Sequence, residues 1–257
     1  MNKQPKLVLR ESCVDDVSAT WRPGRFVEMG AGTGHMAERF LRKGFEGTCH
    51  DLSEVSRSMM RRRFRDLGLG EVVDSLGGLE PEGADYLLAF EVLEHIENDR
   101  EVLKQWLHYL RPGGRILVSV PAHQRKFGRS DELVGHVRRY ERAQLKDLLS
   151  DAGLVDVELF NYGFPVTELT RRLSNRIVLG DKSYDTMTPV ERSMLSAQAK
   201  PRRISRILSV VSGRVVSPFC AIQRMFYRWD LGDGLVASAV KPASARPGSG
   251  LAVQAGQ

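Results

Sequence analysis

The sequence predicts an α/β fold built around a mainly parallel sheet, and three observations lead to this prediction. Short apolar runs alternate with helical patterns through the first 160 residues, as in successive strand–helix–strand units. The run at 85–90 is apolar almost throughout, which is typical of a strand buried on both faces. A glycine-rich turn separates the first strand-like run from the first helical pattern, and ligands bind at such turns in open α/β sheets.

The elements of the first half follow from these patterns in chain order. Ser53 has the side chain of a helix N-cap, and the apolar residues after it recur at helical spacing as far as Leu67. The run at 72–73 is the weakest strand, because only two β-branched residues mark it. The predicted elements are strand 25–29, helix 36–41, strand 46–50, a helix from 53 to 67, strand 72–73 and strand 85–90.

The second half continues the alternation. A helix at 99–110 is expected to stop before Pro112, which cannot continue it, and the two glycines that follow permit a turn. A second helix, at 141–152, is closed by Gly153. The remaining predicted strands are 115–120, 155–160 and 234–240.

About 70 residues separate the sixth and seventh predicted strands, and a structureless loop of that length is uncommon in a compact domain. Ile204, Ile207 and Val211 lie at helical spacing there, which predicts a helical insertion. We therefore expect one domain from residues 1–160 and 233–241, a basic helical insertion or substrate cap at 161–232, and a disordered tail at 242–257.

Composition excludes several classes of protein. The chain has 257 residues, 42% of them hydrophobic, and a net charge of only +6, so it is not disordered throughout. No run approaches about eighteen uncharged apolar residues and no secretory signal is visible, so we expect a cytoplasmic protein. The three cysteines lie far apart, which predicts free thiols rather than disulfides or a zinc site.

The positive charge is concentrated late in the chain. Residues 1–164 contain 24 Lys and Arg against 26 Asp and Glu, whereas residues 165–230 contain 12 against 5. We rank three roles for this basic segment: a substrate cap first, contact of residues 200–216 with an anionic membrane surface second, and nucleic-acid binding third. The alternative to all three is an ordinary solvated basic face. Nucleic acid is ranked last because the aromatic residues are sparse and are expected in the core: Phe219, Phe226, Tyr227 and Trp229.

The most specific motif is EMGAGTG at residues 28–34, whose glycines let a ligand approach the backbone closely. A dinucleotide fingerprint requires a third glycine where His35 stands, and the Glu28 carboxylate would repel a diphosphate. The ligand is therefore expected to be cationic or zwitterionic. Asp51, at the end of the second strand, suits the two hydroxyls of a ribose; the alternative is that it caps the next helix.

These residues resemble the glycine motif and acidic loop of class I S-adenosylmethionine-dependent methyltransferases. ADYLLAFEVLEH at 84–95 and LRPGGRILVSVP at 110–121 are similar to the fourth strand with its loop and to the fifth strand with its turn in that family. GHVRRY at 135–140, with the stretch at 145–153, is similar to the small-molecule branch. The resemblance covers about residues 24–160 and the final strand.

The resemblance implies a Rossmann-like sheet of seven strands in the order 3-2-1-4-5-7-6, with the seventh strand antiparallel and helices on both faces. It also implies S-adenosylmethionine as the cofactor and S-adenosylhomocysteine as the product. Carried over residue by residue, Glu28, Gly30, Ala31 and Gly32 line the methionine part, Asp51 holds the ribose and Leu52 packs on the adenine. The other implied cofactor residues are Asp74, Ser75 and Leu76 near the adenine amino group, and Glu91 and Val92 beside the sulfonium.

A sulfonium methyl group needs an aligned nucleophile, and a hydroxyl nucleophile also benefits from a base. His95 is the candidate base; the alternative is that it only caps the next helix or forms a hydrogen bond within the loop. The candidate substrate-binding residues are His123, His136, Arg139 and Tyr140, although His136 and Tyr140 could instead pin their loop to the core. No histidines or cysteines stand at metal-ligand spacing, so no metal is predicted.

The sequence therefore predicts a methyltransferase that acts on a small or carrier-linked metabolite, with the methyl group transferred to a hydroxyl oxygen. One alternative is a lipid or isoprenoid substrate at the membrane surface. The alternative from another class is a non-catalytic, cofactor-binding scaffold, and the intact glycine turn and Asp51 argue against it.

Overall fold

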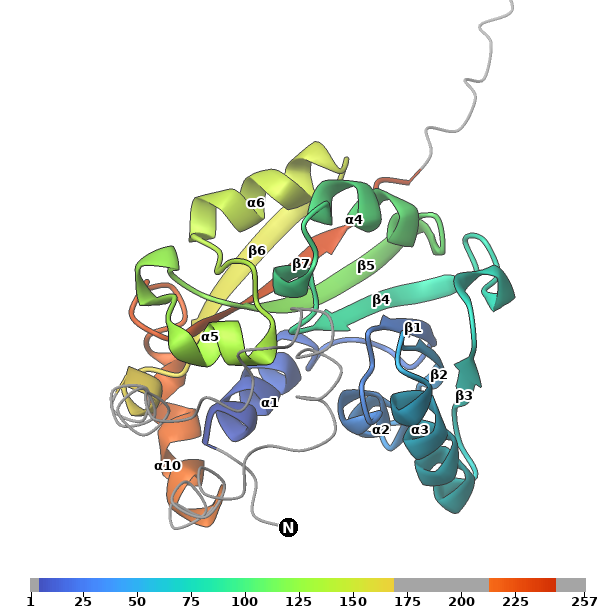
Figure 1. Cartoon of the computed structure of the whole chain (residues 1–257), viewed down its shortest axis with the longest axis horizontal. Helices are drawn as coiled ribbons and strands as arrows, with labels where there is room; N and C mark the ends of the chain where they lie inside the picture. Colours follow the sequence, from blue (N-terminus) through green and yellow to red (C-terminus); the bar gives the residue numbers. More distant parts are fainter. Residues whose placement is uncertain (1–4, 169–212, 244–257) are drawn as a thin grey trace, which may run out of the picture.

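The computed structural model describes residues 5–168 and 213–243, which form a seven-stranded sheet between two layers of helices (Figure 1). The strands are β1 (Arg25–Met29), β2 (Glu46–His50), β3 (Glu71–Val73), β4 (Ala84–Phe90), β5 (Leu110–Pro121), β6 (Val155–Tyr162) and β7 (Gly234–Val240). The helices are α1 (Pro5–Val17), α2 (His35–Leu41), α3 (Glu54–Leu67), α4 (Asp99–Leu107), α5 (Arg129–Val134), α6 (Arg142–Asp151) and α10 (Gly213–Arg224).

The sheet has the predicted topology. Its strand order is β3-β2-β1-β4-β5-β7-β6, and the pairs from β3 to β5 are all parallel. The last strand in the chain, β7, runs antiparallel to both of its neighbours, β5 and β6. The predicted fold class, strand order and direction of the seventh strand are therefore confirmed.

Both faces of the sheet are covered, and β4 shows how. Leu87 and Ala89 point into one hydrophobic core, and Leu88 and Phe90 point into the other. Helices α4 and α6 contribute to the first core, whereas α1, α2, α3 and α10 contribute to the second (Figure 1). Because alternate side chains of β4 all meet apolar partners, the strand reads as a continuous apolar run in the sequence.

Helices α1 and α10 lie side by side although about 200 residues separate them (Figure 1). The Gln223 side-chain amide donates to the carbonyl of Leu9 over 2.9 Å. Arg224 and Tyr227 both donate to the carboxylate of Asp16, over 2.6 and 2.7 Å. The N-terminal helix is thus fixed by the segment that precedes β7.

Several predicted boundaries differ from the structure. Helix α4 ends at Leu107 rather than 110, because Leu110 already pairs with Ala84 of β4 and begins the strand β5. Helices α1 and α5 were not predicted, although Leu9, Cys13 and Val14 form an apolar stripe at helical spacing. Trp229 is exposed, so its predicted place in the core is wrong.

Three further predictions fall wholly or partly outside the residues that the structure describes. The stripe at 204–211, the membrane contact at 200–216 up to residue 212, and the tail from 244 onward lie outside the described residues. Among the residues that the structure describes, no helix is long and apolar enough to cross a membrane. The proposed division into a domain, an insertion and a tail stays a prediction.

Ser53 caps helix α3 as predicted, since its hydroxyl accepts a hydrogen bond from the Ser56 N–H over 3.3 Å. We expect Ser53→Ala to lower stability by about 1 kcal/mol and the melting temperature by about 2–4 °C, because one N–H of the first turn loses its partner. Thermal unfolding followed by circular dichroism measures the shift. Ser58→Ala, on the exposed side of the same helix, is the control and should change stability by less than about 0.5 kcal/mol; equal losses in both variants would contradict the capping role.

Candidate functional site

The glycine turn after β1 leaves room beside its backbone. Gly30 and Gly32 have φ angles of 65° and 56°, a region that residues with a side chain rarely adopt. A Cβ at Gly30 would meet the Val92 side chain at 2.7 Å, so this glycine lets the loops after β1 and β4 pack together. A Cβ at Gly32 would meet nothing within 4 Å among the described residues. The turn is therefore closed on the Gly30 side and open at Gly32.

Asp51 joins the turn to the end of β2. One of its carboxylate oxygens accepts the Gly32 N–H over 2.8 Å, and the other accepts the Ser53 N–H over 2.9 Å. The Ala31 N–H donates to the carbonyl of His50 over 3.0 Å. The carboxylate thus orients the helix entry and is held at the open glycine turn, and its role toward a ribose stays a prediction.

Glu28 supplies a buried carboxyl group on β1, directly before the turn. Its side chain is 2% exposed, and Oε2 has no hydrogen-bond partner among the described residues. Burial raises the pKa of Glu28 to about 8, because the charge of Arg10 compensates only part of the cost and Asp51 adds to it. A cationic ligand in the turn would satisfy this carboxylate, which agrees with the charge expected from the sequence.

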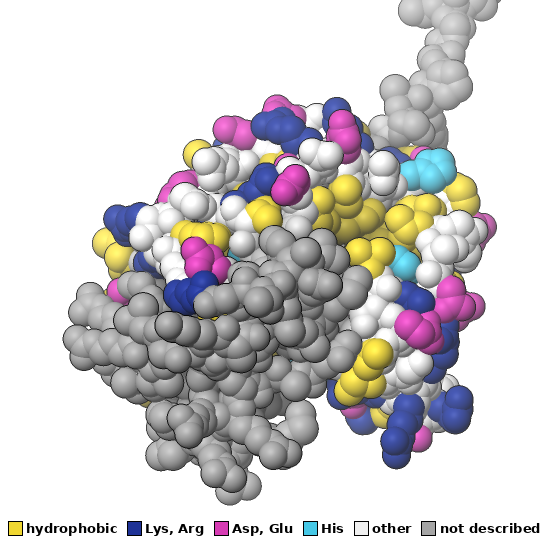
Figure 2. Space-filling model, in the orientation of Figure 1, with side chains coloured by type: hydrophobic (Ala, Val, Ile, Leu, Met, Phe, Trp, Pro, Cys, Tyr) yellow, Lys and Arg dark blue, Asp and Glu magenta, His cyan; other side chains and the backbone are white. Residues whose placement is uncertain are grey.

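The predicted adenine-binding residues lie at the surface beside α3. Leu52 is 77% exposed, which leaves its side chain free to contact a ligand. The Asp74 carboxylate pairs with Arg57 and Arg61, which hold its pKa below the usual range. Figure 2 shows basic and acidic side chains interleaved over the region of α3. Ser75 and Leu76 follow Asp74 at the start of a short 3₁₀ helix, and their roles stay predictions.

Glu91, at the end of β4, is held by partners that the sequence analysis missed. Its carboxylate accepts hydrogen bonds from Lys6, Ser119 and Tyr162 over 3.1–3.2 Å, and Arg10 lies 3.7 Å away. Burial opposes ionisation, but the two cations outweigh it and hold the pKa of Glu91 well below its usual range. Its φ of 57° turns the chain sharply at this point. Helix α1 therefore brings positive charge to the carboxyl edge of the sheet.

His95 lies in the 3₁₀ helix that follows β4, Leu93–His95. Its Nδ1 donates to the carbonyl of Gly135 over 3.0 Å; since a carbonyl only accepts, the proton is on Nδ1 and Nε2 is left as an acceptor. Burial, with a contribution from His136, lowers the pKa of His95 to about 4. The imidazole is therefore neutral near pH 7, as a general base must be.

Tyr140 has contacts that favour its structural alternative, and Arg139 is held in the same way. Arg139 is buried and donates to Asp131, to Asp233 and to the carbonyl of Ala122 over 2.9–3.2 Å. The Tyr140 hydroxyl donates to Asp99 over 2.8 Å, and burial together with Asp99 raises its pKa. These bonds anchor the loop, and a role of either residue in substrate binding stays a prediction.

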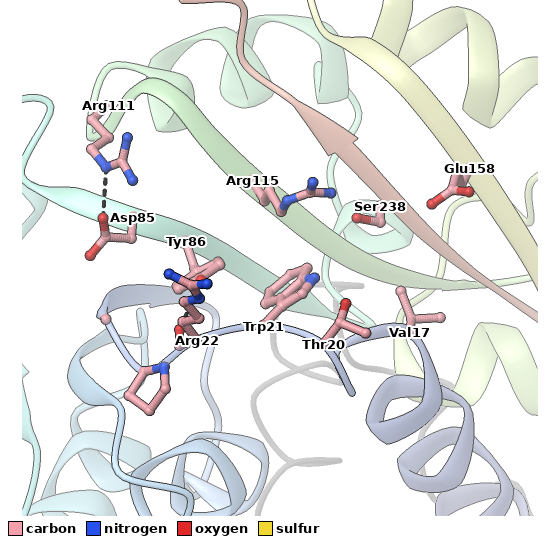
Figure 3. Close-up of a pocket in the computed structure, with 12 residues that line it drawn as sticks. Val17, Thr20, Trp21, Arg22, Asp85, Tyr86, Arg111, Arg115, Glu158 and Ser238 are labelled. Atoms are coloured by element: carbon pink, nitrogen blue, oxygen red, sulfur yellow. Dashed lines mark hydrogen bonds and ion pairs between the residues drawn. The ribbon is translucent and has the colours of Figure 1, made fainter.

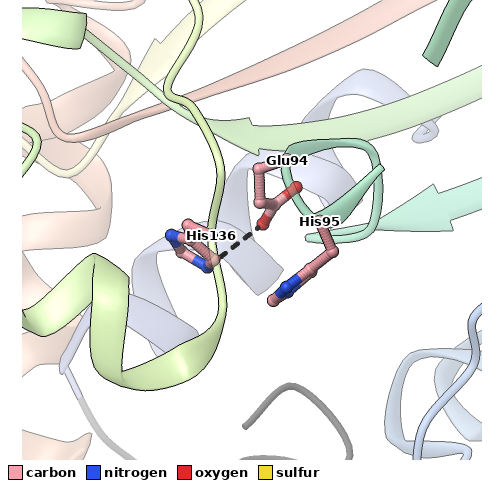
Figure 4. A group of neighbouring side chains, drawn as sticks. All are labelled: Glu94, His95 and His136. Carbon is pink, nitrogen blue, oxygen red and sulfur yellow. Dashed lines mark ion pairs between the residues drawn. The ribbon is translucent and has the colours of Figure 1, made fainter. Parts of the chain in front are cut away.

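The remaining two predicted substrate-binding histidines are also buried or nearly so. His123 Nδ1 donates to Glu141 over 3.3 Å. His136 Nδ1 donates to Asp131 over 2.9 Å, and its Nε2 lies 3.6 Å from Oε1 of Glu94 (Figure 4). The fold thus brings His95, His136 and Glu94 together, although the two histidines are far apart in the sequence. The predicted absence of a metal rested on sequence spacing, which cannot detect such a group.

A separate cleft of about 580 Å³ lies at the opposite, amino end of the strands (Figure 3). Trp21 and Tyr86 stack there with their ring centres 4.6 Å apart, and Arg111 pairs with Asp85 over 2.6 Å. None of the predicted cofactor or substrate residues lines this cleft. The candidate site is therefore at the carboxyl edge, where β1, β2 and β4 end.

The buried carboxyl of Glu28 predicts a pH-dependent gain from Glu28→Gln. The folded protein holds the Glu28 proton up to about pH 8, whereas the unfolded chain releases it near pH 4.5. Stability that depends on this proton is therefore complete below pH 4.5 and is lost as the pH rises through 8. We expect E28Q to raise the melting temperature by more than about 2 °C at pH 8 and by much less at pH 5, measured by scanning fluorimetry.

The matched control is Glu46→Gln, because Glu46 is an exposed residue on the neighbouring strand β2. It should change the melting temperature little at either pH. An E28Q shift of the same size at pH 5 and pH 8 would show that Glu28 is ionised in the folded protein throughout this range.

Comparison with known proteins identifies similar proteins and a matching family. Residues 9–159 match the family described as a methyltransferase domain. The ubiquinone biosynthesis O-methyltransferase of Xylella fastidiosa is 27% identical over 100 residues, which cover 37% of this chain and 41% of that protein. An S-adenosyl-L-methionine-dependent Diels–Alderase of a Neonectria species is 27% identical over 150 residues, which cover 52% of this chain and 59% of that protein.

A solved structure shows the same fold. It is phosphoethanolamine N-methyltransferase 2 of Haemonchus contortus with phosphomonomethylethanolamine and S-adenosylhomocysteine, with a TM-score of 0.58 and 17% identity over 91% of this chain and 52% of that one. The chain spans about two fifths of the length of the O-methyltransferases it matches. The family match covers more than half of the chain and includes the glycine turn, β4 and β5, so the chain belongs to the class I S-adenosylmethionine-dependent methyltransferase family.

Proposed function

We propose that the protein transfers a methyl group from S-adenosylmethionine to a hydroxyl oxygen of a small or carrier-linked metabolite. The observation that carries the cofactor assignment is the buried Glu28 carboxyl with an unpartnered oxygen directly before a glycine turn that is open at Gly32. A dinucleotide would bring negative charge to this carboxyl, whereas S-adenosylmethionine brings an ammonium and a sulfonium. The residues present therefore fit the cofactor of the family.

In this proposal the chain holds the cofactor along the carboxyl edge. Glu28, Gly30, Ala31 and Gly32 hold the methionine part, and Asp51, already oriented by two backbone N–H groups, accepts the ribose hydroxyls. The exposed Leu52 covers the adenine. The remaining contacts are Asp74, Ser75 and Leu76 at the adenine edge, and Glu91 and Val92 near the sulfonium. When bound, S-adenosylmethionine supplies a strongly electrophilic methyl group.

The choice of oxygen as the methyl acceptor rests on two supports. The relative from Xylella fastidiosa is named as an O-methyltransferase. His95 has a neutral imidazole with Nε2 as an acceptor, which suits it to take the proton that a hydroxyl loses. Alignment of the hydroxyl with the methyl group supplies most of the rate, and the base adds about 10²–10⁴-fold.

Two alternatives have specific support. The same relative is named for ubiquinone biosynthesis, which favours a lipid or isoprenoid substrate at a membrane surface. The Neonectria relative is named as a Diels–Alderase, which favours a cofactor-dependent reaction without methyl transfer. In that second case the protein would bind S-adenosylmethionine and leave it intact.

The test of the proposal is incubation of the full chain with S-adenosylmethionine labelled in the methyl group, together with cell extract as the substrate source. We expect label to appear in small molecules in a form that resists hydrolysis, as an ether does, with release of an equal amount of S-adenosylhomocysteine. Tight cofactor binding with no label transferred would contradict methyl transfer and support the non-transferring alternative. Flotation with anionic vesicles tests the membrane alternative, which fails if the protein stays at the bottom of the gradient at low salt.

Comparison of Gly32→Ala with Gly68→Ala should separate the effect of a side chain on cofactor binding from its effect on backbone strain. The new methyl group would occupy the open side of the turn, so we expect the dissociation constant for S-adenosylhomocysteine to rise at least about tenfold, measured by calorimetry. Gly68→Ala is the control, because Gly68 has a φ of 64°, also meets nothing within 4 Å and lies at the end of α3. Both variants should lose about 1–2 kcal/mol of stability from strain, and only G32A should lose affinity; unchanged affinity in G32A would remove the turn from the cofactor site.

A further inference from the structure

We propose that Glu94, His95 and His136 form a binding site for one divalent transition-metal ion of the zinc type. Each residue offers one ligand atom, and these atoms all lie within 4.8 Å of one another (Figure 4). Glu94 and His95 come from the 3₁₀ helix after β4, and His136 comes from the loop after α5. The Val137 N–H donates to the Glu94 carbonyl over 2.8 Å, which fixes the two segments against each other.

Glu94 is the strongest evidence for a ligand. Its side chain is 0% exposed, and neither carboxylate oxygen has a hydrogen-bond partner among the described residues. A buried carboxyl without partners costs stability, and such groups are rare in folded proteins unless a ligand satisfies them.

Both histidines are held in the orientation that metal-binding histidines adopt. His136 Nδ1 donates to the Asp131 carboxylate over 2.9 Å, and His95 Nδ1 donates to the Gly135 carbonyl over 3.0 Å. Each ring therefore keeps Nε2 as the acceptor that can bind a cation. A carboxylate or carbonyl behind each ligating histidine is the usual second layer of a metal site. Arg139 in turn fixes Asp131 over 2.9 Å.

The distances and the ligand types favour a transition metal. Ligands 2.0–2.1 Å from a tetrahedral zinc ion lie about 3.3–3.4 Å apart, and Nε2 of His136 is 3.6 Å from Oε1 of Glu94. The widest pair, at no more than 4.8 Å, closes by a side-chain movement of about 1.5 Å or less. Two imidazoles and one carboxylate suit Zn²⁺ or Co²⁺, whereas Mg²⁺ prefers oxygen ligands. Three protein ligands leave a position open, as catalytic zinc sites do.

The nearby cations do not oppose such an ion. Lys6 and Arg10 are the positive groups that act on Glu94, and both face Glu91, with Lys6 only 3.1 Å from its carboxylate. Their charge is thus largely balanced by Glu91. The competing explanation is that Glu94 is simply protonated in the folded protein, with no ion bound. The two explanations differ in what happens when metal is added.

The catalytic use of this ion rests on the proposed function. The site follows Glu91 and Val92 directly, and Val92 packs against Gly30 of the cofactor turn. A divalent cation lowers the pKa of a hydroxyl group that it contacts, and the released proton goes to solvent. Because Nε2 of His95 would bind the ion, the cation would then replace His95 as the means of activating the hydroxyl.

The test uses the full chain without a histidine tag, treated with chelator and then titrated with Zn²⁺ by calorimetry and with Co²⁺ by visible absorption. We expect one equivalent of either metal to bind. Glu94→Gln and His136→Ala should weaken binding more than about 100-fold and abolish the Co²⁺ absorption bands. Glu94→Gln keeps the size of the side chain and removes a buried acid, so it should remain folded. His108→Ala, which removes an exposed histidine, is the control and should bind like the wild type.

Binding of less than one equivalent, or equal affinity in the wild type and in both ligand variants, would overturn the metal site. The proposed function is tested by a different measurement, methyl transfer. Methyl transfer that is the same in chelator-treated protein and after addition of Zn²⁺ would overturn the catalytic use of the ion and leave the proposed function standing. One equivalent of bound Zn²⁺ with no methyl transfer would contradict the proposed function and leave the metal site standing.

Discussion

The site depends on how the fold compensates three carboxyl groups that it buries at one edge of the sheet. Glu28, Glu91 and Glu94 lie at or just beyond the carboxyl ends of β1 and β4, where burial penalises the charged form of each. Of the three, only Glu91 forms ion pairs with a lysine or arginine among the described residues, Lys6 and Arg10 of α1, and these cations act on the other carboxyls from farther away. The other two retain oxygens without partners among the described residues. The positions that the protein leaves uncompensated are those where positively charged ligands are proposed.

The sheet could be predicted because its signals are local. Strands β1, β4 and β5 each have an apolar run in the sequence, and the glycine turn marks the point where β1 passes into α2. Order and direction came from the resemblance to a family, since pairing between distant strands leaves no local signal. The boundary between α4 and β5 was misplaced because pairing of Leu110 with β4 overrides helical spacing.

The site was predictable only in part, for the same reason. The glycine turn and Asp51 belong to recognisable motifs that follow consecutive strands. Lys6 and Arg10, in contrast, reach Glu91 from a helix about 80 residues earlier, and no motif links them to it. The motif GHVRRY identifies a loop, but it does not indicate which of its side chains face the protein interior and which face a substrate. In the structure Arg139 and Tyr140 point to internal acids, and His136 points to Glu94. Residue type alone cannot distinguish a loop anchor from a ligand, because both roles use the same polar groups.

The position of β7 between β5 and β6 has a consequence for how the protein is made. On the ribosome, β6 emerges more than 70 residues before the strand that joins it to the sheet. Until β7 has been synthesised, β5 and β6 are both unpaired edges, which are prone to associate with other chains. The parallel half of the sheet can pair before β7 is made, whereas the antiparallel half needs β7 for both of its pairings. Slow synthesis of residues 163–233 would therefore prolong the exposure of both edges.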